Sequence, residues 1–301
     1  MSPNTVKPYQ WISAGFAFAA LWASASTATK IGLTSGQPLV IAVTRFMLAA
    51  AIMLFIAHGV RRKRLPRGQE WTQIAIYGAL NVAIYLGLYI IAMQTITAGI
   101  GALAVATNPV FISFLSVIFL KKKLTPPLIG SIIICMTGVV CAAWPLFGSA
   151  EVTVKGLLIL LFSMLSYSVA AIYFSARKWE GLDLFTINGW QTFIGGLLLF
   201  PIALFLYKKD LNHFDKRFWG SVCWLAIPVS IFAVLLWLWL LRSNPVKAGL
   251  WLFLCPLFGF SFAAWIMKEP LTIYTAVGVM LVIGGLLLSG ISAKKNEVVF
   301  D

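Results

Sequence analysis

Long apolar runs alternate with short polar segments along almost the whole chain. A helix needs about 20 residues to cross the hydrocarbon core of a bilayer, and ten runs come close to or reach that length. These runs are Trp11–Leu33, Leu39–Val60, Trp71–Met93, Gly99–Leu120, Leu128–Trp144, Gly156–Phe174, Ile187–Leu206, Trp219–Leu241, Val246–Met267 and Ile273–Ile291. The pattern predicts an all-α integral membrane protein with ten transmembrane helices.

An internal repeat relates the fourth run to the ninth. The fourth run has Asn108 and Pro109 at its centre, and the ninth has Pro256 at the matching place, 147 residues later. The copies lie five runs apart, so two homologous halves must point in opposite directions across the membrane. The sequence therefore predicts two inverted five-helix repeats, residues 1–147 and 148–301, around a central cavity.

The two prolines predict breaks in their helices. A proline inside a helix leaves the carbonyl four residues earlier without its usual donor, and here those carbonyls belong to Val105 and Leu252. Lipid cannot satisfy them, so they must face protein or a water-filled cavity. We predict that Pro109 and Pro256 are hinges beside the cavity. A simple packing kink is the alternative, but two prolines at symmetric positions favour the cavity.

Composition supports a membrane protein and excludes several other classes. The chain is 60% hydrophobic and 11% charged, whereas soluble domains carry about 25% charged residues. The net charge of +14 does not indicate nucleic-acid binding, because the basic residues lie in short loops. All four cysteines lie in apolar runs, where small buried hydrophobes are expected rather than disulfides or metal ligands: Cys135, Cys141, Cys223 and Cys255. We predict no catalytic residue, no metal and no cofactor.

The lysines and arginines predict the orientation. Most of them fall in segments that face the cytoplasm if the N-terminus is cytoplasmic, such as residues 61–64 and 121–123. Positive residues are enriched on the cytoplasmic side of membrane proteins, so both termini are expected there, with the chain in the cell (inner) membrane. The loop at residues 208–217 is an exception, and Asp210 and Asp215 dilute its charge.

Polar and aromatic side chains recur at helical spacing inside the runs. On the third run, tyrosine or asparagine returns every four residues from Tyr77 to Tyr89, which places these side chains along one face. Such groups need hydrogen-bond partners at membrane depth. We therefore predict that the cavity lining includes Trp22, Ser26, Asn81, Tyr85, Tyr89, Ala106, Asn108, Tyr167 and Trp237.

Two cations lie inside predicted helices. Arg45 is a few residues inside the start of the second run, with no acidic residue at its depth, and Lys30 lies near the same level. Either side chain can extend to the membrane surface or bond carbonyls of a neighbouring helix. The third possibility is that they bind an anionic group of a substrate. The sequence leaves these roles, substrate-binding or structural, open.

Several segments resemble EamA-type members of the drug/metabolite transporter superfamily. They are WASASTATKIGLTSGQPLVIAVTRFMLAA at residues 22–50, AMQTITAGIGALAVATNPVFISFLSVIFL at residues 92–120, and KEPLT at residues 268–272. The resemblance implies ten helices in two inverted repeats, a central cavity and alternating access, with Trp22, Lys30 and Arg45 at family positions. One departure is that the first repeat has Lys121 and Lys122 where the family has Gly-Glu, so only the second repeat keeps the acid, as Glu269.

The leading hypothesis is a secondary transporter that exports small metabolites, with amino acids as the expected class. The expected partners are the lipid bilayer and a small-molecule substrate, without nucleic acid, and the oligomeric state is open, a monomer being compatible with the sequence. An exporter of cationic drugs with the same fold is the alternative. An intramembrane enzyme is a remote one, because the chain has neither HExxH nor GxSxG and its only histidines are His58 and His213.

Overall fold

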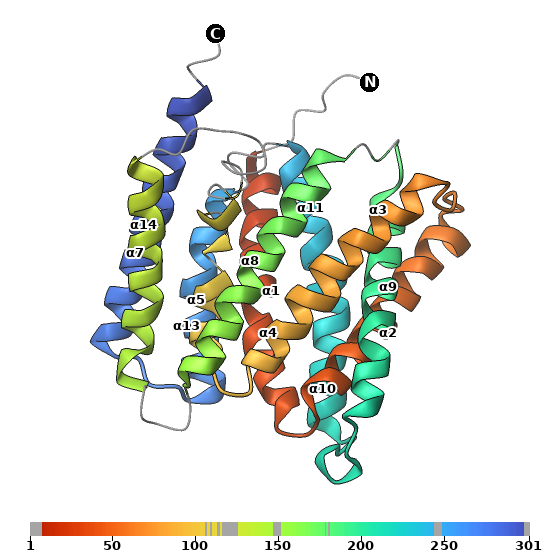
Figure 1. Cartoon of the computed structure of the whole chain (residues 1–301), viewed down its shortest axis with the longest axis horizontal. Coiled ribbons are helices and arrows are strands. Elements are labelled where there is room, and N and C mark those ends of the chain that lie inside the picture. The colour runs from red at the N-terminus through yellow and green to blue at the C-terminus, as the bar shows by residue number, and fades with distance from the viewer. Residues whose placement is uncertain are drawn as a thin grey trace.

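The computed structural model is a bundle of helices (Figure 1). The structure describes residues 8–105, 107–108, 110–112, 115, 126–146, 152–177, 179, 181–243 and 249–297. This part of the chain contains ten longer helical segments, one short 3₁₀-helix and no β-strand. The predicted all-α architecture is confirmed.

Five segments belong to the first half. Several change from α-helix to a wider π-helix or a tighter 3₁₀-helix along their length. In chain order the elements are α1 (Pro8–Leu33), α2 (Pro38–Leu54) with the π-helix η1 (Phe55–Val60), α3 (Gln69–Gly78) with the π-helix η2 (Ala79–Leu86) and α4 (Gly87–Ala92), α5 (Ala98–Val105), and α7 (Pro126–Ala143) with the 3₁₀-helix η3 (Trp144–Leu146).

The second half repeats this order. Its elements are α8 (Val154–Ala176), α9 (Leu184–Phe205), the short 3₁₀-helix η4 (Lys209–Leu211), α10 (Lys216–Trp224) with the π-helix η5 (Leu225–Ala233) and α11 (Val234–Ser243), the 3₁₀-helix η6 (Gly249–Leu254) with α13 (Cys255–Met267), and α14 (Ile273–Glu297).

Five of the described helices are long and apolar enough to cross a membrane. They are Pro38–Val60, Gln69–Ala92, Val154–Phe174, Leu184–Phe205 and Lys216–Trp237. Shorter apolar helices accompany them, and α1 has 26 residues, about 39 Å at 1.5 Å per residue. Large apolar side chains face outward from the bundle, such as Phe205 and Trp265, which are 87% and 73% exposed. A lipid environment accounts for that exposure.

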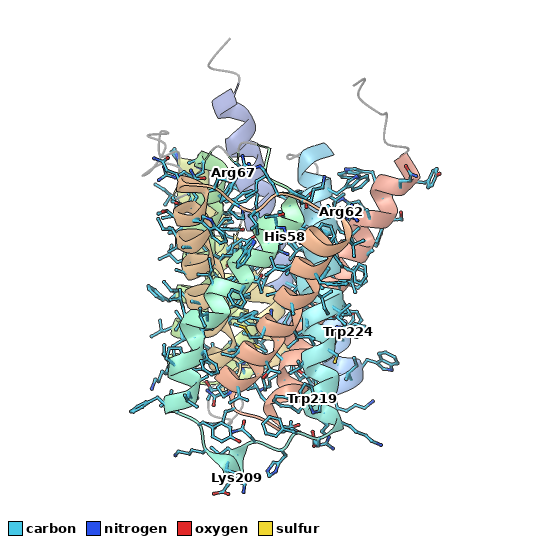
Figure 2. The ribbon with its side chains drawn as sticks, turned by 90° about the vertical axis from the view of Figure 1, so that its right-hand side faces the viewer. His58, Arg62, Arg67, Lys209, Trp219 and Trp224 are labelled. Atoms are coloured by element: carbon cyan, nitrogen blue, oxygen red, sulfur yellow. The ribbon has the colours of Figure 1, made fainter. Side chains whose placement is uncertain are left out.

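The positions of the chain ends and of the loops distinguish the two ends of the bundle. α1 begins and α14 ends at the same end (Figure 1). His58, Arg62 and Arg67 lie at that end and Lys209 lies at the opposite one (Figure 2). We call them the basic end and the far end. An even number of crossings places both described chain ends on the same side of the membrane.

A cap at the far end starts α10. The Asp215 carboxylate accepts hydrogen bonds from the amides of Arg217 and Phe218 at 3.0 and 2.9 Å, and from the Ser35 hydroxyl at 3.0 Å. The Phe218 amide contributes most to holding the pKa of this carboxyl below its ordinary value. Capping of this kind satisfies amides that the first turn of a helix leaves without partners.

The packing of α7 against α14 shows the inverted symmetry directly. A shift of 147 residues turns Ser131 into Gly278 and Gly138 into Gly285. A Cβ on Gly138 would lie 2.8 Å from the carbonyl oxygen of Gly278, and a Cβ on Gly285 would lie 2.9 Å from that of Ser131. These are the same contact seen from each half, as a two-fold axis between the helices requires.

We expect Gly278→Ala to destabilise the protein and Gly284→Ala, on the same helix, to leave its stability unchanged or slightly higher. The new Cβ at position 278 would lie 2.6 Å from both the Ala142 Cβ and the Gly138 carbonyl oxygen, whereas no atom lies within 4 Å at position 284. Overpacking costs about 1–3 kcal/mol. Melting temperatures of the two purified variants check this, and equal values would contradict close helix contact at Gly278.

Candidate functional site

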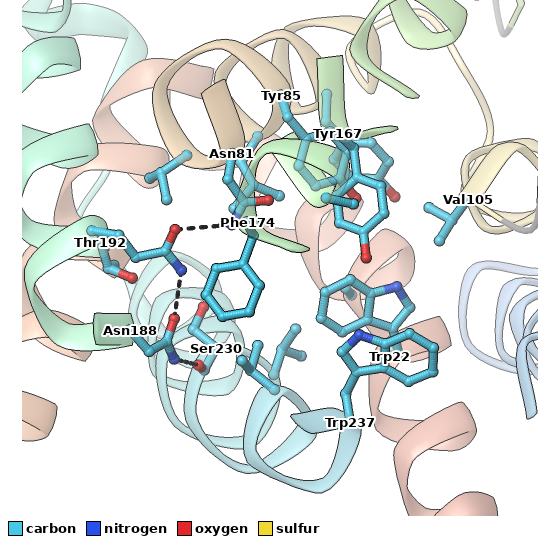
Figure 3. Close-up of a pocket in the computed structure, with 18 of the residues that line it drawn as sticks. Trp22, Asn81, Tyr85, Val105, Tyr167, Phe174, Asn188, Thr192, Ser230 and Trp237 are labelled. Atoms are coloured by element: carbon cyan, nitrogen blue, oxygen red, sulfur yellow. Dashed lines mark hydrogen bonds between the residues drawn. The ribbon is translucent and has the colours of Figure 1, made fainter. Parts of the chain in front are cut away.

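A cavity of about 460 Å³ lies between the two halves. Residues of both halves line it, from Trp22 on α1 to Asn188 on α9 and Trp237 on α11 (Figure 3). Arg45 on α2 also lines it. This volume is in the range of pockets that enclose small organic molecules.

One wall of the cavity is aromatic. Trp22, Tyr85, Tyr167 and Trp237 contribute to it (Figure 3). The ring centroids of Tyr85 and Tyr167 lie 4.9 Å apart. Phe18, which is buried behind the wall, stacks on Trp237 with a centroid distance of 4.8 Å. These contacts fix the rings and present flat apolar surfaces to a ligand.

The opposite wall is polar and contains a chain of hydrogen bonds that we call the amide ladder (Asn81, Gln191, Asn188 and Ser230). Asn81 donates to the Gln191 side-chain oxygen at 3.1 Å, and Gln191 donates to that of Asn188 at 2.7 Å. Asn188 donates to the Ser230 carbonyl at 3.2 Å, as the dashed lines in Figure 3 show. The ladder joins the third helix of the first half to two helices of the second.

Arg45 completes the polar wall. The side chain is 4% exposed. Its Nη2 donates to the Ser230 hydroxyl at 3.5 Å, a long contact, and its Nε has no hydrogen-bond partner. The guanidinium also lies 4.7 Å from the Phe46 ring centroid. No described acidic residue lines the cavity.

Two π-helical segments shape the cavity from equivalent positions of the two halves. η2 covers residues 79–86 and η5 covers residues 225–233, which nearly coincide after a shift of 147. Asn81 and Tyr85 come from η2, and Ser230 comes from η5. π-helical turns often mark functional sites.

The cavity extends to the basic end of the bundle. Phe174 and Ala176 at the end of α8 line it, together with Leu184 at the start of α9. Ala176 is exposed. Phe174 also stacks on Trp179 and packs on Tyr77, with centroid distances of 4.8 and 5.0 Å, so an aromatic cluster frames this mouth.

At the far end, Glu269 holds two helices together. Its two carboxylate oxygens accept hydrogen bonds from the amides of Ala98 and Gly99 at 2.6 and 3.0 Å. These are the first amides of α5, where a helix concentrates positive partial charge. Glu269 follows α13 in the other half. The acid that the sequence singled out thus closes a contact between halves.

Further bonds close the far end. Lys30 Nζ donates to the Met93 carbonyl at 3.1 Å. The Thr153 hydroxyl donates to the Thr95 hydroxyl at 3.0 Å, and the Thr153 amide donates to the Thr95 carbonyl at 3.1 Å. The far end is therefore held by bonds between helices, while the cavity reaches the basic end.

Most residues predicted as lining border the main cavity: Trp22, Ser26, Asn81, Tyr85, Tyr89, Tyr167 and Trp237. Arg45, for which the sequence left a substrate-binding or a structural role open, borders it as well. Asn108 instead lines a second cavity of about 30 Å³ behind the aromatic wall. Lys30 borders neither and makes the structural bond to Met93. Pro256 lies in the first turn of α13, directly after η6, where a missing amide donor costs little. Ala106 and Pro109 lie outside the described residues.

The prediction missed the polar residues of the seventh helix. Asn188, Gln191 and Thr192 line the cavity together with Ser230. Gln191 and Thr192 follow Asn188 by three and four residues, so the three side chains lie on one face of the helix. This spacing is a signal that the sequence contains. Ser230 has no polar residue three or four positions away in its run, and no sequence signal marks it. Among the described residues, no group of three or more His, Cys, Asp or Glu could hold a metal.

Comparison with known proteins identifies the family. The profile of the EamA-like transporter family matches residues 9–144 and 154–291, which is one match in each half. The chain belongs to this family of transporters, as the sequence resemblance predicted. It is a multi-pass membrane protein with the two-repeat architecture of the family.

Individual relatives agree over nearly the full chain. An uncharacterized transporter of Archaeoglobus fulgidus is 23% identical, with 92% of this chain and 95% of that protein covered. Protein PecM of Dickeya dadantii is 27% identical, with 91% and 90% covered. A solved crystal structure superposes with a TM-score of 0.65 at 15% identity over 95% of this chain and 99% of that one, which shows the shared fold.

We expect Glu269→Gln to loosen the far end. The glutamine amide has one acceptor oxygen for two amides and no charge, whereas hydrogen bonds to a charged group contribute about 1.5–3 kcal/mol each. A cysteine placed at Ser26 in a background without native cysteines reports on access. An impermeant thiol reagent, added on the side of the far end, should label this cysteine several-fold faster in Glu269→Gln than in the parent with Glu269.

The matched control is Asp215→Asn, which removes another carboxylate cap at the same end without touching α5. Its labelling rate should equal that of the parent. Equal rates for all three proteins would show that Glu269 does not hold the far end closed.

Proposed function

We propose that this protein is a secondary transporter of the cell (inner) membrane that exports small amphipathic metabolites, amino acids foremost, by alternating access. In this proposal both chain termini lie in the cytoplasm, and the basic end faces the cytoplasm. The observation that carries the proposal is the cavity between the halves, with one aromatic wall and one polar wall that includes Arg45. An amino acid offers an apolar side chain to the first wall and a carboxylate to the second.

The orientation rests on charge. The loop that follows η1 holds Arg61, Arg62, Lys63, Arg64 and Arg67 at the basic end, and positive residues favour the cytoplasmic side. In that orientation the cavity reaches the cytoplasm and the bonds of Glu269 and Lys30 close the outer side. The structure then corresponds to the state that loads an exported substrate. The proposed partners are the bilayer and the substrate; nucleic acid is not among them.

An exporter of cationic drugs is the second candidate, and the cavity gives it less support. The described lining has a buried cation and no carboxylate, so a cationic ligand would meet repulsion in a medium of low dielectric constant. An intramembrane enzyme is the remote candidate, and the family match favours transport over it.

We expect purified protein in proteoliposomes to show saturable uptake of a radiolabelled amino acid with an apolar side chain. Arg45→Ala should reduce uptake at a substrate concentration below half-saturation by at least tenfold, because a carboxylate would lose its charged partner. Arg217→Ala, an exposed cation at the far end, serves as the control and should behave as the parent. Absence of saturable flux for every amino acid tested would reject the substrate class.

We also expect facilitated or exchange transport rather than proton coupling. The described lining contains no carboxylate or histidine that could carry a proton. An imposed pH gradient across the proteoliposome should therefore leave the final internal substrate level unchanged. Uphill accumulation driven by the gradient would contradict this expectation.

A further inference from the structure

The main cavity contains a single unbalanced charge. Of the described residues that line it, Arg45 is the one charged side chain. A buried charge without a partner is strongly unfavourable, so a ligand that supplies the opposite charge gains more at this point than at any other in the cavity. The guanidinium contacts the Ser230 hydroxyl and the Phe46 ring, and it interacts electrostatically with Tyr85 and Tyr89.

The hydrogen bonds of the polar wall lead to the same residue. Asn81, Gln191 and Asn188 satisfy one another along the amide ladder and end on the Ser230 carbonyl. A guanidinium carries five N–H donors, and the one bond found for Arg45 is 3.5 Å long. Among the lining residues it alone has a buried polar atom without a partner. The wall therefore lacks one component, an acceptor at Arg45.

A carboxylate is the acceptor that fits. It can take two parallel N–H bonds from a guanidinium, an arrangement stronger than neutral hydrogen bonds. The α-ammonium group of an amino acid finds no carboxylate in the described lining and meets only neutral oxygens, such as the hydroxyls of Tyr85 and Ser26. The charge pattern of the site complements one negative charge rather than a zwitterion.

Building on the proposed function, we infer that the site selects its substrate through the carboxylate on Arg45, and that the α-ammonium group is dispensable. The substrate class then extends to monocarboxylates with an aromatic or branched apolar body. Such acids bind at least as tightly as the amino acids with the same body. The aromatic wall holds the body and the polar wall holds the carboxylate.

A matched set of three ligands tests this on the purified full-length protein. 3-Phenylpropanoate, phenylalanine and phenethylamine share the phenyl body and carry a carboxylate alone, both groups, or an ammonium alone. Binding is measured by thermal shift and by intrinsic tryptophan fluorescence, to which Trp22 and Trp237 contribute. Uptake is not used, since the uncharged forms of the first and third ligands cross bilayers unaided. Ligand binding to the native state raises its stability.

We expect 3-phenylpropanoate to bind at least as tightly as phenylalanine, and phenethylamine to give no saturable shift. 2-Phenylethanesulfonate, a permanent anion of similar size, should compete with 3-phenylpropanoate. Arg45→Gln should weaken the binding of the acid tenfold or more, equivalent to about 1.4 kcal/mol, and Arg45→Lys should restore part of it. Arg217→Gln, at an exposed cation of the far end, should leave binding unchanged.

Opposite outcomes overturn the inference. Binding of phenylalanine without binding of 3-phenylpropanoate would show that the ammonium group is required, and preference for phenethylamine would show a cation site. Loss of acid binding in Lys30→Gln but not in Arg45→Gln would show that Lys30, and not Arg45, binds the carboxylate. Each of these results would leave the proposed transport function standing. The absence of saturable flux for every amino acid tested would instead count against the proposed function. The ligand comparison on the parent protein needs no variant to fold.

Discussion

Lipid cannot bond polar groups at membrane depth, so another part of the chain or a water-filled cavity must satisfy them. The amide ladder does this across three helices, and the bond from Lys30 to the Met93 carbonyl does it at the far end. Glu269 satisfies the first amides of α5. The amide ladder and the bonds of Glu269 hold helices of the two halves together, so the pairing of polar groups also decides at which end the cavity can be reached.

Among the described residues that line the main cavity, Arg45 is the exception, and it gives the cavity its chemistry. Its neighbours satisfy one another, and its Nε has no partner. A group whose bonding is incomplete without substrate gains a partner when the substrate binds. The substrate can shift the equilibrium between two conformations only if it binds one of them more tightly than the other. An unpaired buried cation gains more from such a partner than an unpaired amide or hydroxyl.

The two halves share an architecture but not the chemistry of their ends. The contacts of α7 with α14 follow the two-fold relation closely, and the π-helical segments η2 and η5 occupy nearly equivalent positions. Glu269, however, corresponds to Lys122 in the first half. A lysine cannot accept hydrogen bonds from the first amides of a helix, and its charge opposes the helix dipole there. The first half therefore has no acid at the sequence position that corresponds to Glu269.

Periodicity and composition predicted the all-helical, two-repeat architecture, and most of the residues that they named as lining border the main cavity. Those features depend on spacing along one helix, such as the four-residue interval from Tyr77 to Tyr89, or on comparing one half with the other. The partners of polar groups were beyond such reasoning. Lys30 bonds a carbonyl 63 residues away in the sequence, and Glu269 bonds an amide 171 residues away. Such partners come into contact only when the helices pack against each other. The sequence thus determined which groups are buried in the membrane. The tertiary structure decided which of them bond each other and that the Nε of Arg45 has no partner, because bonding within the membrane depends on which helices meet.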